Sequence, residues 1–359
     1  MLERHQKLAL YMEGALTEAP GKMGFGLLRY SPNPVACVID SRYAGQNVQD
    51  VIDTPRSCPV VATIAEAVAL GSEVFVLGIA PAGGLIPEEW WPVIDDAVAS
   101  GLSIVNGLHD PIGPRYPGLF PHPPAPSPRH EPFAERGRLG QWIWDIRIEP
   151  SGLGVGTAAA AGLTNRRVLM IGTDMNVGKM TAGLEIHRLA LERGIKSEFV
   201  ATGQIGVTIM GSGVPLDAVR VDFASGAMER EMLRTKEADL VIVEGQGALI
   251  HPGSTANLPL LRGTCPTHLI LCHRARQETL QRNPSIKIPP LRDYLKLYED
   301  LAEACGTFPR PVSIGVALNT ANLPEDAAQA EIERIEETTG LPCTDPVRFG
   351  AAQLLEGLG

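Results

Sequence analysis

Apolar residues in the first 150 positions fall into two alternating patterns. Short continuous runs, typical of strands buried on both faces, occur at 35–40, 73–79, 102–106 and 141–147. Helical spacing follows some of these runs, at 66–70 and 87–100. Buried strands separated by helices indicate a parallel sheet covered on both sides. We therefore predict a Rossmann-like parallel-sheet domain over residues 1–150. Because it lacks a GxGxxG sequence, no dinucleotide site is expected there.

The same alternation restarts in the second half of the chain. The expected strands are 167–171, 197–201, 239–244, 268–272 and 312–318, and the expected helices are 178–193, 225–236, 294–305 and 325–338. The Gly- and Ala-rich stretch 151–165 indicates the boundary, so a second α/β domain is expected over 151–359. Segment 111–132 contains nine prolines and is expected to be an extended loop.

The turn between strand 167–171 and helix 178–193 has the features of a phosphate-binding loop. A strand before it and a helix after it are the context that such a P-loop needs. Glycines let backbone N–H groups approach phosphate oxygens, the helix N-terminus adds a partial positive charge, and Lys179 adds a full one. The second domain is therefore predicted to be P-loop NTPase-like. The predicted cofactor-binding residues here are Gly172, Thr173, Asp174, Val177, Gly178, Lys179, Met180 and Thr181.

This loop departs from the usual GxxxxGK[ST] pattern at two points. Five residues rather than four separate Gly172 from Gly178. Met180 stands where a Ser or Thr normally ligates Mg²⁺, and a thioether is a poor ligand for that hard ion. We expect phosphate binding, whereas metal-assisted transfer of a γ-phosphate is disfavoured. A second Gly-Lys-Met sequence, 21–23, has no strand before it and is expected to be a plain loop.

Candidate catalytic residues follow the predicted strands of the second domain, whose carboxyl ends meet at one edge of the sheet. Glu244 ends the strand 239–244 and suits a general base or a metal ligand. Asp222 and His251 lie in neighbouring segments and are further candidates for a base. The alternatives stay open: Glu244 as a structural carboxylate, Asp222 as a helix cap and His251 as a surface residue.

Four polar residues are candidates for substrate binding. Gln204 and Gln246 follow two neighbouring strands and should face the same crevice. Arg274 and Arg276 follow the strand 268–272, and guanidinium groups bind carboxylates in a bidentate manner. Solvated surface charge is the alternative for both arginines.

Composition narrows the classes of function. The 359 residues carry a formal net charge of −10, which argues against a broad nucleic-acid or anionic-membrane surface. No apolar run approaches a membrane span, and the charged N-terminus does not resemble a secretory signal, so a cytoplasmic location is expected. The six cysteines form no CxxC pair and are expected to be reduced thiols, with no metal site.

Together these motifs resemble one family, a two-domain P-loop family long labelled as being of unknown function. The resemblance rests on 172–181, 202–204, 221–229, 243–247 and 251–252, with 38–40 and 145–147 fitting the N-terminal domain. Some members are assigned as D-glutamate N-acetyltransferases that act beside a dipeptide-epimerase-like enzyme. The P-loop itself resembles that of dethiobiotin synthetase, which implies that Asn319, at the end of the strand 312–318, reads an adenine. A plain turn residue is the alternative for Asn319.

Three functions are compatible with these residues. The first is acetyl transfer from acetyl-CoA to the amine of a small amino acid such as D-glutamate, with the P-loop holding the CoA phosphates. The second is an ATP-dependent ligase or kinase in which Glu244 and Asp174 hold Mg²⁺. The third is a non-enzymatic nucleotide sensor. We expect a small-molecule substrate and a homo-oligomer, with no nucleic-acid or membrane partner.

Overall fold

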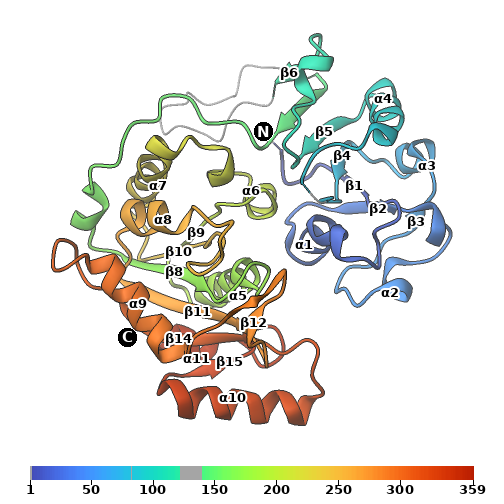
Figure 1. Ribbon diagram of the computed structural model, residues 1–359. Coiled ribbons are helices and arrows are strands. Elements are labelled where there is room, and N and C mark those ends of the chain that lie inside the picture. The colour runs from blue at the N-terminus through green and yellow to red at the C-terminus, as the bar shows by residue number, and fades with distance from the viewer. Residues whose placement is uncertain (1, 82, 122–139) are drawn as a thin grey trace. The chain divides into compact units, whose positions relative to one another are not determined.

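The computed structural model describes residues 2–81, 83–121 and 140–359, drawn along the chain in Figure 1. It divides into two compact units. Unit 1 contains Met1–Ser151 together with Gln204–Ala218, and unit 2 contains Gly152–Gly203 together with Val219–Gly359. The second half of the proline-rich segment, 122–132, lies outside the described residues. Its described part ends in an edge strand rather than a central one.

Unit 1 is built on a seven-stranded parallel sheet in the order β3-β2-β1-β4-β5-β7-β6. Its strands are β1 (Leu8–Tyr11), β2 (Val35–Ile39), β3 (Val60–Val61), β4 (Val74–Leu77), β5 (Ser103–Asn106), β6 (Phe120–Pro121) and β7 (Trp142–Asp145). Its helices are α1 (Lys22–Tyr30), α2 (Val48–Val51), α3 (Ile64–Ala69), α4 (Trp91–Ala99) and α6 (Gln204–Met210). The order reverses between β1 and β4, as in a Rossmann sheet, so the predicted fold is confirmed.

The turn after β1 is filled by side chains of the protein itself. A Cβ built on Gly24 would lie 2.3 Å from Met12 Sδ. Asp40, at the end of β2, is fully buried and accepts hydrogen bonds from Leu16 N at 3.2 Å and Arg42 Nη2 at 3.1 Å. In a Rossmann sheet, the region beside these strand ends would receive a dinucleotide. In this chain, the Asp40 carboxylate in that region holds the turn after β1 through its hydrogen bond from Leu16 N.

The prediction that 21–23 is a plain loop is wrong, because α1 begins at Lys22. Met23, Leu27 and Leu28 recur at helical spacing and are buried, and α1 contacts α6. This packing stabilises a helix that could not be predicted from the Gly-Lys-Met sequence alone.

Unit 2 is built on a six-stranded parallel sheet in the order β15-β14-β11-β8-β10-β9. Its strands are β8 (Arg166–Gly172), β9 (Ser197–Val200), β10 (Leu240–Val243), β11 (His268–Arg274), β14 (Val312–Asn319) and β15 (Cys343–Thr344), with a hairpin of β12 (Thr279–Leu280) and β13 (Asn283–Lys287). Its helices are α5 (Lys179–Glu192), α7 (Val221–Arg234), α8 (Asn257–Thr264), α9 (Leu291–Glu303), α10 (Glu325–Thr339) and α11 (Ala352–Glu356).

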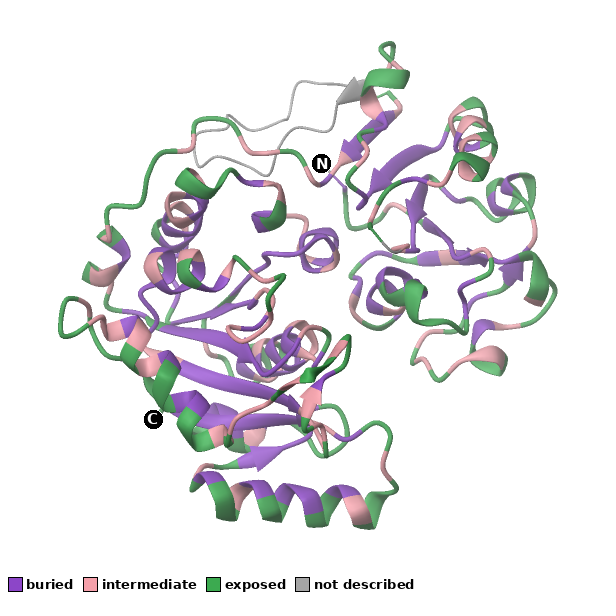
Figure 2. Ribbon diagram, viewed as in Figure 1, coloured by how far each residue is buried: buried purple, intermediate pink, exposed green. Residues whose placement is uncertain are grey.

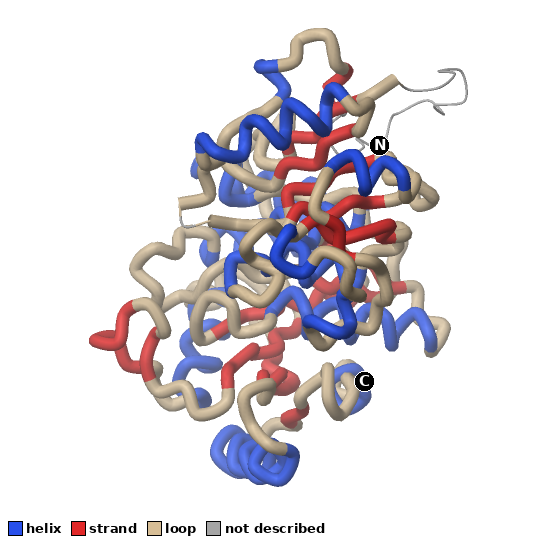
Figure 3. The backbone as a smooth tube through the Cα atoms, turned by 90° about the vertical axis from the view of Figure 1, so that its right-hand side faces the viewer, coloured by secondary structure: helices blue, strands red, loops and turns tan. Residues whose placement is uncertain are grey.

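Burial follows the apolar pattern of the sequence. The sheet strands are largely buried in both units, whereas helices such as α10 alternate between buried and exposed positions (Figure 2). On α10 the buried residues Ala328, Ile332 and Ile335 recur at helical spacing, so one face packs inward. Figure 3 separates the helices from the strands in a second view. The predicted strands and long helices are confirmed, with bounds shifted by a few residues.

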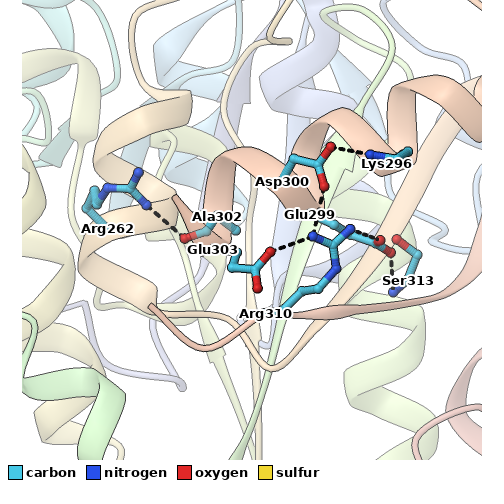
Figure 4. Close-up of polar contacts among 8 residues, drawn as sticks. All are labelled: Arg262, Lys296, Glu299, Asp300, Ala302, Glu303, Arg310 and Ser313. Atoms are coloured by element: carbon cyan, nitrogen blue, oxygen red, sulfur yellow. Dashed lines mark hydrogen bonds and ion pairs between the residues drawn. The ribbon is translucent and has the colours of Figure 1, made fainter. Parts of the chain in front are cut away.

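A network of charged groups fixes α9 beside the start of β14 (Figure 4). Arg310 pairs with Asp300 at 2.8 Å, Glu303 at 2.7 Å and Glu299 at 3.0 Å. Glu299 also accepts a hydrogen bond from Ser313 N at 3.1 Å, and Arg262 of α8 donates to Ala302 O at 3.0 Å. The position of α9 matters because its Tyr294 contacts the first residue of the P-loop.

Candidate functional site: the P-loop of unit 2

The P-loop joins the end of β8 to the start of α5. Gly178 has φ of +106°, in the left-handed region that favours glycine, and it directly precedes the helix. Asn176 also has a positive φ, of 56°. A Cβ on Gly172 would lie 2.8 Å from Lys179 Nζ, so a side chain there would displace the lysine. The loop therefore has the backbone conformation and the close approach that an anion-binding turn needs.

Lys179 is the buried cation of the site, with 7% of its surface exposed. Its Nζ donates to Asp174 O at 2.9 Å. Burial lowers the pKa of its ammonium, and the nearby Cys272, Glu244 and Asp174 act in the opposite direction. An ammonium held with so little water around it is expected to gain strongly from an anionic ligand.

Asp174 shapes the loop through hydrogen bonds. Its Oδ1 accepts from Met175 N at 2.7 Å. Its Oδ2 accepts from Gln277 Nε2 at 2.7 Å and from Gln281 N at 2.8 Å. Oδ1 therefore holds the backbone of the loop itself, whereas Oδ2 joins the loop to the segment that follows β11.

The neighbouring Thr173 links the loop to strand β11 itself. Its Oγ1 lies 2.9 Å from His273 Nδ1, and both residues are buried. Burial, aided by the Arg334 guanidinium and opposed by Glu331, lowers the pKa of His273 to about 4. The imidazole is therefore neutral at pH 7, so the link is a neutral hydrogen bond and His273 contributes no cation to the site.

The two candidate arginines have different surroundings. Arg274 Nη2 donates to Asn176 O at 2.9 Å, which places the guanidinium against the P-loop. Arg274 Nε is buried and has no hydrogen-bond partner among the described residues. Arg276 is exposed and has a positive φ of 62°. Only Arg274 is therefore brought to the loop by a hydrogen bond.

Glu244 and Gln246 lie on the other side of β8, after β10. Glu244 Oε2 accepts from Thr202 N at 2.9 Å and from Gly203 N at 3.1 Å. A Cβ on Gly203 would lie 2.4 Å from Gln246 Nε2, so that glycine allows the close approach. Gln246 and Lys179 line one cavity of about 10 Å³, which is the size of a water molecule. Glu244, Gln246 and Lys179 thus form one cluster.

Tyr294 of α9 connects this cluster to the start of the P-loop. Its hydroxyl donates to Gly172 O at 3.2 Å and accepts from Leu249 N at 3.0 Å. Burial raises the pKa of Tyr294 above its ordinary value, so the hydroxyl stays protonated. The residue fixes the loop after Glu244 relative to the phosphate-binding turn.

Asn319 lies at the end of β14, in register with Arg274 on β11. Its Nδ2 is 4.0 Å from the position of a Cβ on Gly178, and its Oδ1 accepts from Ala321 N at 3.1 Å. Its amide is therefore beside the P-loop, where the resemblance to dethiobiotin synthetase expects an adenine-reading residue.

The remaining predicted residues are placed as follows. Met180 and Thr181 are half-buried in the first turn of α5, and Val177 is buried 3.0 Å from the Cβ position of Gly172. Asp222 is exposed in the first turn of α7. His251 is half-buried, and its Nδ1 accepts from Gly253 N at 3.1 Å. Gln204 belongs to unit 1, where its Cγ is 3.1 Å from the Cβ position of Gly107.

Two further properties bear on the class of protein. Within 2–81, 83–121 and 140–359, no group of three or more His, Cys, Asp or Glu side chains is arranged to hold a metal ion. None of the helices described has both the length and the apolar character needed to cross a membrane.

Comparison with known families identifies the class to which this site belongs. Residues 154–355 match a family model described as a domain of unknown function (DUF1611_C), P-loop domain. Residues 41–116 match the model described as DUF1611_N, Rossmann-like domain. The chain therefore belongs to the DUF1611 family, which confirms the resemblance stated from its motifs.

Individual relatives give more detail. A protein of Pseudoalteromonas sp. named D-glutamate N-acetyltransferase is 34% identical over 301 residues, covering 82% of this chain and 84% of its own. A protein of Tritonibacter scottomollicae with the same name is 35% identical with the same coverage. The crystal structure of a DUF1611 family protein from Anabaena variabilis matches with a TM-score of 0.88 and 45% identity over 99% of both chains.

The residues elsewhere in the chain that hydrogen-bond to the P-loop were not predicted from the sequence. His273, Gln277, Gln281 and Tyr294 all contact residues 172–174, yet none belongs to a recognisable motif. The only signal was position, because His273 and Gln277 follow a predicted strand next to the P-loop strand.

Proposed function

We propose that the protein transfers an acetyl group from acetyl-CoA to the amine of an acidic amino acid such as D-glutamate. The observation that carries this proposal is a P-loop with a buried Lys179 but with Met180 where a metal-binding hydroxyl belongs. Such a loop suits a ligand whose phosphates are held and left intact. The names of two relatives, each matched over most of this chain, support the same reaction.

The residues of the site fit this ligand. The loop amides and Lys179 would hold the pyrophosphate, and the Asn319 amide would read the adenine edge. Acetyl-CoA supplies a thioester, whose C–S bond breaks as the amine forms the new C–N bond. The protein must remove a proton from the substrate ammonium. Glu244 is our first choice for this base because it belongs to the Lys179 cluster.

The ligase alternative has weaker support, because the side chains that would have to ligate Mg²⁺ are poorly suited to it. It needs Asp174 and Glu244 to hold Mg²⁺, but both Asp174 oxygens accept hydrogen bonds and Glu244 Oε2 accepts two. Met180 adds no hard ligand.

The test is product formation by the purified protein. Acetyl-CoA should be mixed with D-glutamate, L-glutamate or neutral amino acids, and both thiol release and the acetylated product measured. We expect N-acetyl-D-glutamate with wild type and a loss of at least about 100-fold in kcat with Glu244→Gln, the range of one general base. No thiol release with any amino acid, together with ADP formation from ATP and a carboxylate, would contradict the proposal.

A further inference from the structure

We infer that Arg274 is a second phosphate-binding cation of the P-loop, and that this loop binds phosphates without a divalent metal ion. The inference rests on the proposed function only in taking CoA as the ligand. It changes the role of Arg274, which the sequence pattern assigned to a substrate carboxylate.

A pyrophosphate brings at least two negative charges, and P-loops ordinarily meet them with a lysine and Mg²⁺. Here the side chains that would ligate the ion are unsuitable. Met180 offers a thioether, and the carboxylate of Asp174 is held by Met175 N, Gln277 Nε2 and Gln281 N. The second cation must therefore come from elsewhere in the chain.

Arg274 lies at the end of β11, the neighbour of the P-loop strand β8. Its Nη2 donates to Asn176 O, so the guanidinium touches the loop through one of its five N–H donors. Its Nε is buried without a partner among the described residues. A buried donor without an acceptor is costly, and an anion at the loop would supply one after a small rotation of the side chain.

Contacts of nearby residues hold Arg274 in place. The residues on either side of it are tied to the same loop, by the Thr173–His273 contact at 2.9 Å and the Gln277 to Asp174 hydrogen bond at 2.7 Å. Arg274 is therefore positioned before a ligand arrives, so little entropy is lost on binding. Its register partner Asn319 lies beside Gly178, which places a base-reading amide next to the same cation.

The experiment is isothermal titration of the full chain with CoA, in buffer with Mg²⁺ and in buffer with EDTA. We expect the wild-type dissociation constant to differ by less than about twofold between the buffers. Arg274→Gln should weaken binding about tenfold or more in both, the cost of one charge-assisted contact. The matched control is Arg282→Gln, which removes the same charge from an exposed residue of the β12–β13 hairpin and should bind as wild type.

Two variants guard against a trivial loss of folding. Arg274→Lys keeps the charge without the planar fork and should give an intermediate affinity. Met180→Thr restores a metal-binding hydroxyl, so Mg²⁺ should strengthen CoA binding in this variant and not in wild type. Melting temperatures report whether each variant is folded.

The outcomes separate the two claims. A tenfold loss of wild-type affinity in EDTA, or an unchanged affinity in Arg274→Gln, would overturn the inference and leave the proposed function standing. If CoA does not bind but inorganic pyrophosphate binds in EDTA and needs Arg274, the proposed function fails and the inference holds. If neither ligand binds, both are wrong.

Discussion

Two helices of this protein begin with the same residues, Lys-Met after a glycine, and only one of them follows a P-loop turn. In unit 1, α1 begins at Lys22 after Gly21, which has an ordinary negative φ of −69°, and Lys22 is exposed. In unit 2, α5 begins at Lys179 after Gly178, which has φ of +106°, and Lys179 is buried. The Gly-Lys-Met sequence does not make the site. The left-handed glycine and the inward position of the lysine do.

The carboxylates beside the two turns differ in the same way. Asp40 of unit 1 is fully buried, and its oxygens accept from Leu16 N and from Arg42, which closes the turn. Glu244 of unit 2 accepts from Thr202 and Gly203 and remains in the cluster with Lys179. Asp40 is used to hold a turn, whereas Glu244 lies beside the buried cation of the P-loop.

The largest expected effect comes from removing the lysine of each turn. Lys179→Ala should weaken CoA binding about 100-fold or more, because charge-assisted hydrogen bonds to phosphate contribute about 1.5–3 kcal/mol each. Lys22→Ala should bind CoA as wild type. Titration calorimetry on both variants measures this. Equal losses of CoA affinity in the two variants would contradict the difference drawn between the two turns.

The two units should also differ in how much stability they lose in mild acid. His187, His268 and His273 lie in unit 2, and burial lowers the pKa of each. His273 has a pKa of about 4 in the folded chain against 6.5 when unfolded, so between these values the unfolded state binds more protons. Its contribution is complete above pH 6.5 and is lost as pH falls toward 4, by roughly 3 kcal/mol.

Thermal unfolding from pH 7 to pH 4.5 tests this sign. Replacing the buried histidine, as in His273→Gln, should flatten the fall in stability, whereas replacing the exposed one, as in His5→Gln, should leave it unchanged. A fall of the same slope in His273→Gln would show that other groups cause it.

A smaller effect is expected from the backbone of the P-loop. Gly178→Ala meets no close atom, but its left-handed φ costs a side chain about 1–2 kcal/mol, so CoA binding should weaken about fivefold to thirtyfold. Gly194→Ala, at the other end of α5 with φ of +76°, carries similar strain away from the loop. It should lower the melting temperature and leave CoA binding intact. Weaker binding in Gly194→Ala would mean that strain anywhere in α5 is enough.

The smallest effect is expected at the charged network of α9. Arg310 is an exposed residue paired with Glu299, Asp300 and Glu303, and such pairs are weak in water. Arg310→Gln should shift the melting temperature slightly, and less in high salt, without changing CoA binding. A large loss of binding would show that the position of Tyr294 depends on this network.

More of the fold than of the candidate site could be predicted from the sequence. Continuous apolar strands and helical spacing were enough to predict both parallel sheets, and Gly178-Lys179 after a strand was enough to predict the P-loop. Helix α1 was missed because its buried face contacts α6, which comes much later in the chain. The hydrogen bonds of His273, Gln277 and Tyr294 to the P-loop join residues 100 to 122 positions apart, and no local pattern encodes them.

The most direct test of the account is ³¹P NMR of acetyl-CoA, because it observes the phosphates that the P-loop is proposed to hold. In EDTA, wild-type protein should shift or broaden the pyrophosphate resonances, and Lys179→Ala should leave them as in free acetyl-CoA. The account would be contradicted if acetyl-CoA bound both proteins equally well with its pyrophosphate resonances unchanged, because the acetyl donor would then be held without the P-loop.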